Sequence, residues 1–210
     1  MKKIIFISIL TVGGLLFATL QPSVFHKKKS SKIVFRTGDI IYQSSDYGQS
    51  KAVKLATHSK YSHVGLVVIK EEKTFVLEAV QPVQMIPIND WIARSEDKKY
   101  CLQRLKSETD LTKFTSSLDS ISEVMIGKNY DLLFEWSDEK LYCSELVWKV
   151  YKDVFGIQLC DLKQLEDFDL THPYVKKIMT QRYGKKYPLE QSVVAPQDLY
   201  TSDLLLTLTE

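Results

Sequence analysis

Hydrophobic residues along the chain follow two patterns, one typical of strands and one typical of helices. Segments 32–43 and 99–106 are rich in β-branched and aromatic residues, which predicts strands, the first interrupted by a turn at 37–39. Between them, residues 61–83 hold two apolar runs on either side of "KEEK", the pattern of a β-hairpin. Both faces of each run are apolar, so we expect this hairpin to lie within a core sheet.

Apolar residues at three-four spacing predict the helices. The clearest case is 110–127, where the spaced residues are Leu111, Phe114, Leu118, Ile121 and Met125. Further helices are expected within 44–60, over 142–155 and from Pro173 to the residue before Gly184. Because strands are grouped ahead of the main helices, we expect an α+β domain over residues 33–210, built around an antiparallel sheet.

The N-terminal segment has the layout of an export signal. Lys2 and Lys3 precede an uncharged, largely apolar run from Ile4 to about Phe25, and the basic segment "HKKKSSK" follows at 26–32. Residues 1–25 are therefore predicted to be a signal peptide or an N-terminal membrane anchor, because the run approaches the roughly 20 residues that span a bilayer. We expect an exported protein of the periplasm or cell envelope, with cleavage of the segment left open.

Composition changes this picture little and excludes one class of partner. The 210 residues are 44% hydrophobic, enough for the core of one domain. Lysine and arginine number 28 against 26 acidic residues, giving a net charge of +2, and the two signs are interspersed. Nucleic acid is therefore not an expected partner.

The three cysteines raise the question of chemistry. Three thiols form at most one disulfide, so at least one thiol stays reduced within the chain. Cys101 and Cys160 are most simply packing residues, or conceivably a disulfide pair. Cys143 heads the helix predicted over 142–155 and shares its apolar stripe. Unpaired N–H groups at a helix N-terminus favour a thiolate and hold an oxyanion, although packing is the commoner reason for such a cysteine.

A base and an acid are predicted to lie together on the hairpin. His63 opens the first run, and Glu78 stands in "FVLEAV" within the second. A turn at Lys70 and Glu71 pairs His63 with Glu78, whereas a four-residue loop makes them diagonal neighbours; in both registers they share a face. A carboxylate among apolar residues is costly unless paired, and an imidazole is its natural partner. The alternative is a purely structural hydrogen bond.

The order of these segments resembles a known family. "RTGDIIYQ", "YSHVGLVV", "VLEAVQPV", "GKNYD" and "YCSELVWKVY" are similar to the circularly permuted branch of the NlpC/p60 superfamily of papain-like cysteine hydrolases, of the YiiX type, from about residue 36 to "VVAPQDLY". The resemblance implies a permuted papain-like fold, an antiparallel sheet or barrel packed against helices. It also implies Cys143 as nucleophile at a helix N-terminus, His63 as general base and acid, and Glu78 as the third polar residue.

The resemblance implies a cysteine peptidase or amidase without a cofactor or metal. Its expected substrate is an amide in a cell-envelope peptide, such as a peptidoglycan stem peptide, or an acylated amine. A lipid acyl hydrolase or transferase like lecithin retinol acyltransferase is the first alternative, which the basic segment at 26–32 favours. A non-catalytic envelope-binding module is the second. Metal ligation by Cys143, His63 and Glu78 would require a closed ligand set that the motifs do not show. The bond type, the second oxyanion donor and the oligomeric state stay open.

Overall fold

A computed structural model describes residues 33–46, 48–107 and 111–209, with only the backbone described at 111–115. Residues 33–210 group into one compact unit. The predicted signal peptide or anchor at 1–25 and the basic segment after it lie outside the described residues. Among the residues that are described, no helix is both long and apolar enough to cross a membrane.

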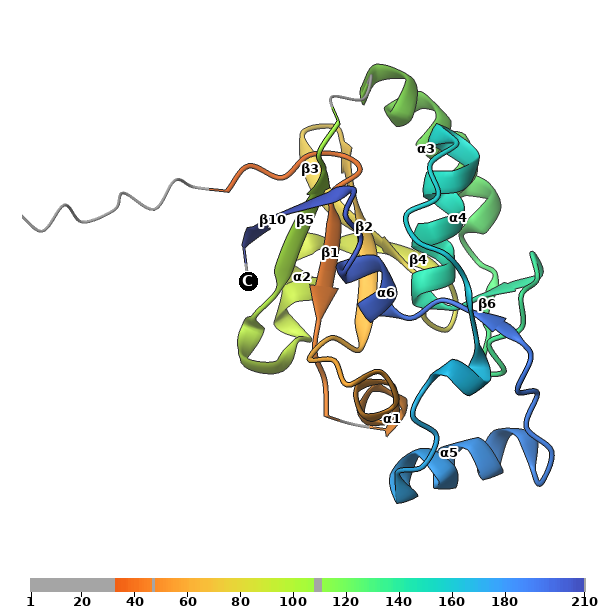
Figure 1. The fold of residues 1–210 in the computed structure, drawn as a ribbon. Coiled ribbons are helices and arrows are strands. Elements are labelled where there is room, and N and C mark those ends of the chain that lie inside the picture. Colours follow the sequence, from red (N-terminus) through yellow and green to blue (C-terminus); the bar gives the residue numbers. More distant parts are fainter. Residues whose placement is uncertain (1–32, 47, 108–110, 210) are drawn as a thin grey trace, which may run out of the picture. The chain divides into compact units, whose positions relative to one another are not determined.

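Six strands form one antiparallel sheet in the order β10-β5-β1-β2-β3-β4 (Figure 1). The strands are β1 (Ile40–Gln43), β2 (His63–Lys70), β3 (Lys73–Glu78), β4 (Gln84–Pro87), β5 (Cys101–Leu105) and β10 (Leu205–Thr209). β1 and β2 are buried along almost their whole length, which explains why both faces of these segments are apolar. The expected α+β fold with an antiparallel sheet is confirmed.

The predicted hairpin consists of β2 and β3. Lys70 pairs with Lys73 across a two-residue turn, and the ladder continues to Leu66 opposite Leu77. Both turn residues, Glu71 and Glu72, have positive φ, as a tight hairpin turn requires. The register is thus the one in which His63 and Glu78 are diagonal, and it places Gly65 opposite Glu78.

Helix α4 (Cys143–Phe155) covers one face of the sheet and contacts β2. Its apolar stripe, Leu146, Val147 and Val150, packs in one cluster with Leu66 and other residues of the central strands. Helix α3 (Leu111–Met125) packs on α4, and α6 (Pro196–Tyr200) contacts it as well (Figure 1). The predicted helices at 110–127 and 142–155 are confirmed.

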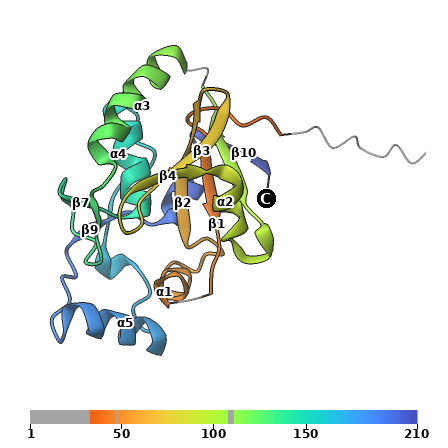
Figure 2. The same ribbon diagram turned by 180° about the vertical axis from the view of Figure 1, so that it is seen from behind.

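The opposite face of the sheet has a smaller core under helix α2 (Ile88–Ala93) (Figure 2). Trp91 is fully buried there with Val67 and Val76. Because side chains alternate along strands, His63 and Glu78 belong to this face, not to the face under α4. The sequence did not predict α2 or the strand β4 that leads into it.

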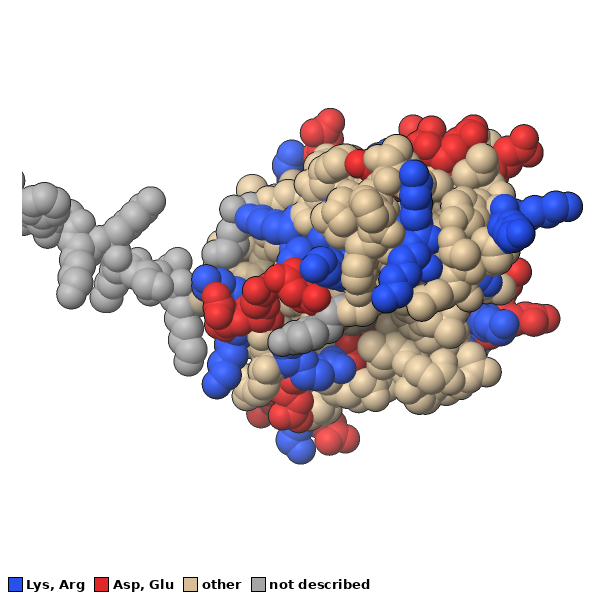
Figure 3. Space-filling view, turned by 90° about the horizontal axis from the view of Figure 1, so that it is seen from below, with Lys and Arg blue, Asp and Glu red and all other residues tan. Residues whose placement is uncertain are grey.

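Helices α1 (Gly48–Thr57) and α5 (Pro173–Tyr183) contact each other beyond the end of β1 (Figure 1). Pro173 occupies the first helical position of α5, and the imidazole of His172 accepts the N–H of Tyr174 at 3.0 Å. Both helices were predicted from the sequence. Basic and acidic side chains are interspersed over the side of the molecule on which α1 and α5 lie (Figure 3).

Short elements complete the described fold. They are η1 (Glu96–Lys98), the parallel pair β6 (Asn129–Tyr130) and β7 (Lys140–Leu141), the antiparallel pair β8 (Lys163–Gln164) and β9 (Ser192–Val193), and η2 (Leu165–Asp167). One prediction was wrong in part: residues 33–36 are not a strand, and β1 begins only after the turn at Thr37. Arg36 N–H instead donates to the Asp39 carboxylate at 2.8 Å, which closes that turn.

Candidate active site

Cys143 is the first residue of α4. The preceding residue, Tyr142, is extended (φ −106°, ψ 166°), and its carbonyl accepts the N–H of Leu146, the first hydrogen bond of the helix. The Cys143 sulfur therefore meets N–H groups that the helix leaves unpaired, and it accepts from the backbone N–H of Val64 and Ser144. Cys143 is 6% exposed and lines the hollow beside it.

His63 joins Cys143 to Glu78 at the end of the sheet. Its Nε2 lies 2.7 Å from Glu78 Oε2, and its ring makes a second hydrogen bond to the Cys143 thiol. Since Glu78 holds Nε2, Nδ1 is the nitrogen left to exchange a proton with Cys143. The structure thus brings together the three residues that the sequence singled out.

Gly65 makes this approach of the two strands possible. A Cβ built on Gly65 would lie 2.4 Å from Val76 Cγ1 and 3.1 Å from the Leu77 carbonyl oxygen, so any side chain would push β3 away. The same Cβ would lie 3.6 Å from Glu78 Cβ. The missing side chain therefore keeps open the space through which His63 reaches its diagonal neighbour.

Glu78 is fully buried and accepts four hydrogen bonds. Besides His63, its donors are Trp91 Nε1 at 2.9 Å, Gln84 Nε2 at 2.9 Å and Arg94 Nη2 at 2.5 Å. The Trp91 indole also stacks beside the His63 ring, 6.0 Å between centroids and 25° between planes. Sequence reasoning missed these three donors. Strand β4 separates Glu78 from Trp91 on α2, and no local sequence pattern signals that the two side chains meet.

These contacts shift the pKa of each member of the trio. Burial alone would raise the pKa of Glu78, but hydrogen bonds from His63, Gln84 and Arg94 lower it to about 2. Burial would lower the pKa of His63, yet its bonds to Cys143 and Glu78 raise it to about 9. Burial would raise the pKa of Cys143, but the hydrogen bond and charge of His63 lower it. The arrangement favours a thiolate–imidazolium pair at neutral pH.

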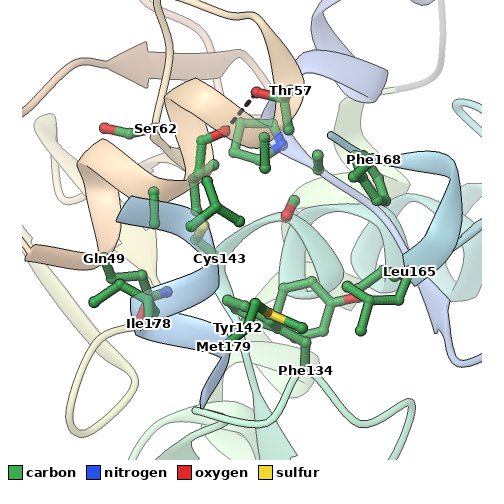
Figure 4. A pocket seen from close by; sticks show the side chains of 18 of the residues that line it. Gln49, Thr57, Ser62, Phe134, Tyr142, Cys143, Leu165, Phe168, Ile178 and Met179 are labelled. Carbon is green, nitrogen blue, oxygen red and sulfur yellow. Dashed lines mark hydrogen bonds between the residues drawn. The ribbon is translucent and has the colours of Figure 1, made fainter. Parts of the chain in front are cut away.

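Cys143 opens onto a largely apolar hollow between α1, α5 and the start of α4 (Figure 4). The hollow holds about 710 Å³ of empty space, the solvent at its mouth included. Its apolar wall includes Ala56, Phe168, Ile178 and Met179. Concave apolar surfaces of this kind bind small molecules or parts of larger substrates.

Tyr130 belongs to the segment "GKNYD", and no separate function was predicted for it from the sequence. In the structure it lines the hollow together with Cys143, and its hydroxyl accepts a hydrogen bond from Gln49 Nε2 at 2.6 Å. Burial and the negative charge on Cys143 raise the pKa of Tyr130 well above its usual value, so the phenol stays protonated. Its O–H proton is then available to an acceptor near the thiol.

The other described histidines, His58 and His172, and the other two cysteines lie elsewhere in the fold. His58 is exposed and pairs with Asp169 at 3.3 Å. Cys101 is buried in β5, and Cys101 and Cys160 are both free thiols, which agrees with packing, the simpler of the two alternatives. Burial raises the pKa of Cys160 to about 12, the opposite of the shift at Cys143.

Comparison with known proteins identifies the family. A sequence model of permuted papain-like amidases, the YaeF/YiiX or C92 family, matches residues 34–209. The chain belongs to this family. It is 42% identical over 175 residues to the uncharacterised protein YiiX of Escherichia coli strain K12, covering 83% of this chain and 86% of that protein.

The fold of this C92 chain is also that of a solved relative. It resembles the crystal structure of metalloprotein yiiX from Escherichia coli O157:H7 with a TM-score of 0.79 and 42% identity, over 83% of this chain and 97% of that one. The predicted permuted papain-like fold is thereby confirmed. Membership of a papain-like amidase family makes the protein a cysteine amidase or peptidase at the level of the family.

Proposed function

We propose that the protein hydrolyses an amide of a cell-envelope peptide or an acylated amine, with Cys143 as nucleophile, His63 as general base and acid, and Glu78 as the residue that orients His63. One observation carries this proposal: His63 hydrogen-bonds Glu78 at 2.7 Å and the Cys143 thiol at the same time. Nucleophile, base and orienting group in one chain of hydrogen bonds are what covalent acyl transfer requires.

The reaction has two halves. The Cys143 thiolate attacks the carbonyl carbon and forms the C–S bond, and the His63 imidazolium then protonates the leaving nitrogen as the C–N bond breaks. The product of this half is a thioester on Cys143 and a free amine. Water, deprotonated by His63, then attacks the thioester, and the carboxylic acid leaves as the thiol is restored. Glu78 keeps Nε2 protonated throughout, so Nδ1 carries every proton transferred.

Two donors are available for the oxyanion formed in each half. The first is the backbone N–H of Cys143 at the N-terminus of α4. We assign the second to the Tyr130 hydroxyl, because it lines the same hollow and Gln49 occupies only its acceptor side. A neutral phenol held by Gln49 is a preorganised donor that needs no reorganisation as charge develops.

The relative from Escherichia coli O157:H7 is named a metalloprotein. In the described part of the chain, no three His, Cys, Asp or Glu side chains converge on a point suited to a metal ion. His63 lies between Cys143 and Glu78, and both Glu78 oxygens already accept hydrogen bonds. The trio does not fit a metal, and the reaction proposed here uses none.

The test is hydrolysis of N-acyl p-nitroanilides by the purified full-length protein, combined with mass spectrometry of the acyl-enzyme. We expect release of nitroaniline and an acyl adduct on Cys143, both lost in Cys143→Ser. Cys160→Ser is the matched control and should retain full activity, since its thiol is outside the hydrogen-bonded trio. No turnover, with Cys143 alkylated no faster than a model thiol, would support a non-catalytic envelope-binding module instead.

The export signal predicted at residues 1–25 supports a proposed place of action in the periplasm or cell envelope. Detection of the protein in periplasmic or membrane fractions tests this separately from catalysis. Recovery in the cytosol alone would contradict the proposed location.

A further inference from the structure

We propose that Tyr142 and Ser144, the residues on either side of Cys143 in the chain, are positioning residues that aim the nucleophile and its oxyanion donor. This inference rests on the proposed cysteine hydrolase and specifies what holds Cys143 in a reactive geometry. Neither residue gives or takes a proton in the reaction. Each acts through the peptide group that it shares with Cys143.

Both side chains are tied to one residue, Val194, which follows β9 in the chain. The Ser144 hydroxyl donates to the Val194 carbonyl at 2.7 Å, and the Val194 N–H donates to the Tyr142 hydroxyl at 3.1 Å. Ser144 is 1% exposed, and Tyr142 and Val194 are each 2% exposed. Because these groups are shielded from water, breaking either hydrogen bond would leave a buried polar group unpaired. The two bonds therefore hold the neighbours of the nucleophile in place.

Tyr142 fixes the peptide group that carries the Cys143 N–H. Its carbonyl accepts the N–H of Leu146 at 3.0 Å, and its own N–H donates to the Glu145 carboxylate at 3.3 Å. With its hydroxyl bonded to Val194 as well, the residue is held at both its backbone and its side chain. The N–H of the next residue then keeps one direction. That N–H is the first oxyanion donor of the proposed reaction.

Ser144 fixes the peptide group on the other side of Cys143. Its backbone N–H donates to the Cys143 sulfur, and its hydroxyl is anchored to Val194. An N–H held toward the sulfur stabilises the thiolate and lowers the pKa of Cys143. Each neighbour thus supports a different function, Tyr142 the oxyanion donor and Ser144 the thiolate.

The first turn of α4 has a second anchor that does not involve Val194. Glu145 is fully buried and pairs with Lys149 at 2.8 Å, and Lys149 also pairs with Asp138 at 2.7 Å. These charges tie α4 to the segment that precedes it, so loss of one hydroxyl from the first turn should leave the helix folded. The effect is then confined to the direction of the nucleophile.

The experiment compares Ser144→Ala and Tyr142→Phe in the full-length protein, by hydrolysis of N-acyl p-nitroanilides and by alkylation of Cys143 with iodoacetamide at pH 7. Both variants should lower kcat roughly tenfold to a hundredfold, since misplacing a reacting group by about 1 Å costs up to about a hundredfold, and should change KM little. Ser144→Ala should also slow alkylation, because the N–H that stabilises the thiolate loses its anchor. Tyr142→Phe should leave alkylation unchanged, because iodoacetamide forms no oxyanion.

The matched controls are Ser122→Ala and Tyr151→Phe, which also remove buried hydroxyls bonded to the backbone. The Ser122 hydroxyl donates to the Asp119 carbonyl at 2.9 Å, and the Tyr151 hydroxyl donates to the Gly38 carbonyl at 2.6 Å. Both residues are 1% exposed and lie outside the first turn of α4. These variants should lose stability in urea but keep kcat, so they show what the loss of a buried hydroxyl alone does.

The outcomes separate this inference from the proposed function. Turnover that requires Cys143, with no greater loss of kcat in Ser144→Ala and Tyr142→Phe than in the controls, would overturn the positioning role and leave the hydrolase intact. A rise in KM at unchanged kcat would make the two residues substrate contacts and would also overturn it. No turnover by the wild-type protein, with Cys143 alkylated no faster than a model thiol, would overturn both.

Discussion

His63 Nε2 lies 2.7 Å from the buried Oε2 of Glu78, although 15 residues separate them in the chain. Trp91 Nε1 donates to the same oxygen at 2.9 Å, so the carboxylate is held on two sides. A carboxylate fixed in this way determines which nitrogen of His63 carries a proton, and the other nitrogen faces the thiol. The imidazole is positioned before any substrate binds.

Replacing Glu78 with glutamine should lower kcat by about 10²- to 10⁴-fold, the range of general acid–base catalysis. The amide preserves the shape of the side chain but does not stabilise the imidazolium, so the pKa of His63 should fall. The measurements are steady-state kinetics and the His63 pKa by NMR. Gln84→Ala is the control, since it removes one Glu78 donor that does not touch His63. Unchanged kcat in Glu78→Gln would show that Glu78 serves only the fold.

The pKa shifts predict different pH dependences for alkylation and for amide hydrolysis. The pKa of Cys143 is lowered, so its alkylation by iodoacetamide at pH 7 should be faster than that of a model thiol and show no fall at high pH. Hydrolysis also needs the imidazolium, which is lost as the pH rises through the His63 pKa of about 9. Amide kcat/KM should therefore fall above about pH 9 while alkylation does not.

The controls for this pH experiment are within the same chain. Cys160, with its pKa raised to about 12, should react slowly at neutral pH. In His63→Ala, burial dominates at Cys143 and raises its pKa, so alkylation at pH 7 should slow. If Cys143 reacts as slowly as Cys160 in the wild-type protein and in His63→Ala alike, the thiolate–imidazolium pair does not form.

The sequence was sufficient to place His63 and Glu78 on one face because both registers considered, with a two-residue turn or a four-residue loop, preserve the alternation of side chains. It left the register open because "KEEK" contains no Asn-Gly or Asp-Gly to locate the turn, and Glu71 and Glu72 adopt positive φ without that signal. The position of Cys143 was predicted for a similar reason, since the stripe of α4 extends regularly from its first turn.

No local sequence pattern predicted the donors to Glu78 or the hollow beside Cys143. Trp91 and Arg94 reach Glu78 only because residues 84–94 fold back along β3, a tertiary event that neither periodicity nor charge pattern encodes. The hollow arises where α1 meets α5, more than a hundred positions later in the chain, and each helix alone reads as an ordinary amphipathic segment. Residues 33–36 were predicted as a strand because Ile33 to Phe35 are apolar, but they lie before the turn that β1 follows.

Gly65→Ala should destabilise the fold by about 1–3 kcal/mol, the usual cost of an overpacked core. The new methyl group would meet Val76 Cγ1 at 2.4 Å, and relief by movement of β3 would also draw Glu78 from His63. Urea unfolding gives the free energy, and kcat reports the site. Val76→Ala removes the atom in closest conflict, so the double variant should be less destabilised than the sum of the single variants. Strict additivity would show that the contact with Val76 is not the cause.

Tyr130→Phe tests the second oxyanion donor. Removal of one donor from such a site costs about 10²- to 10³-fold in kcat, whereas KM should change little because the ring that lines the hollow is retained. Alkylation of Cys143 should also be unchanged, since iodoacetamide forms no oxyanion.

Tyr183→Phe is the matched control for Tyr130→Phe. It removes a half-buried hydroxyl that donates to the Leu133 carbonyl and is not among the groups lining the hollow. A loss of kcat in Tyr130→Phe alone, with normal thiol reactivity, separates stabilisation of the oxyanion from activation of the nucleophile. A parallel loss of alkylation would instead assign Tyr130 to the positioning of Cys143, and the second donor would have to be sought among the backbone N–H groups around the thiol.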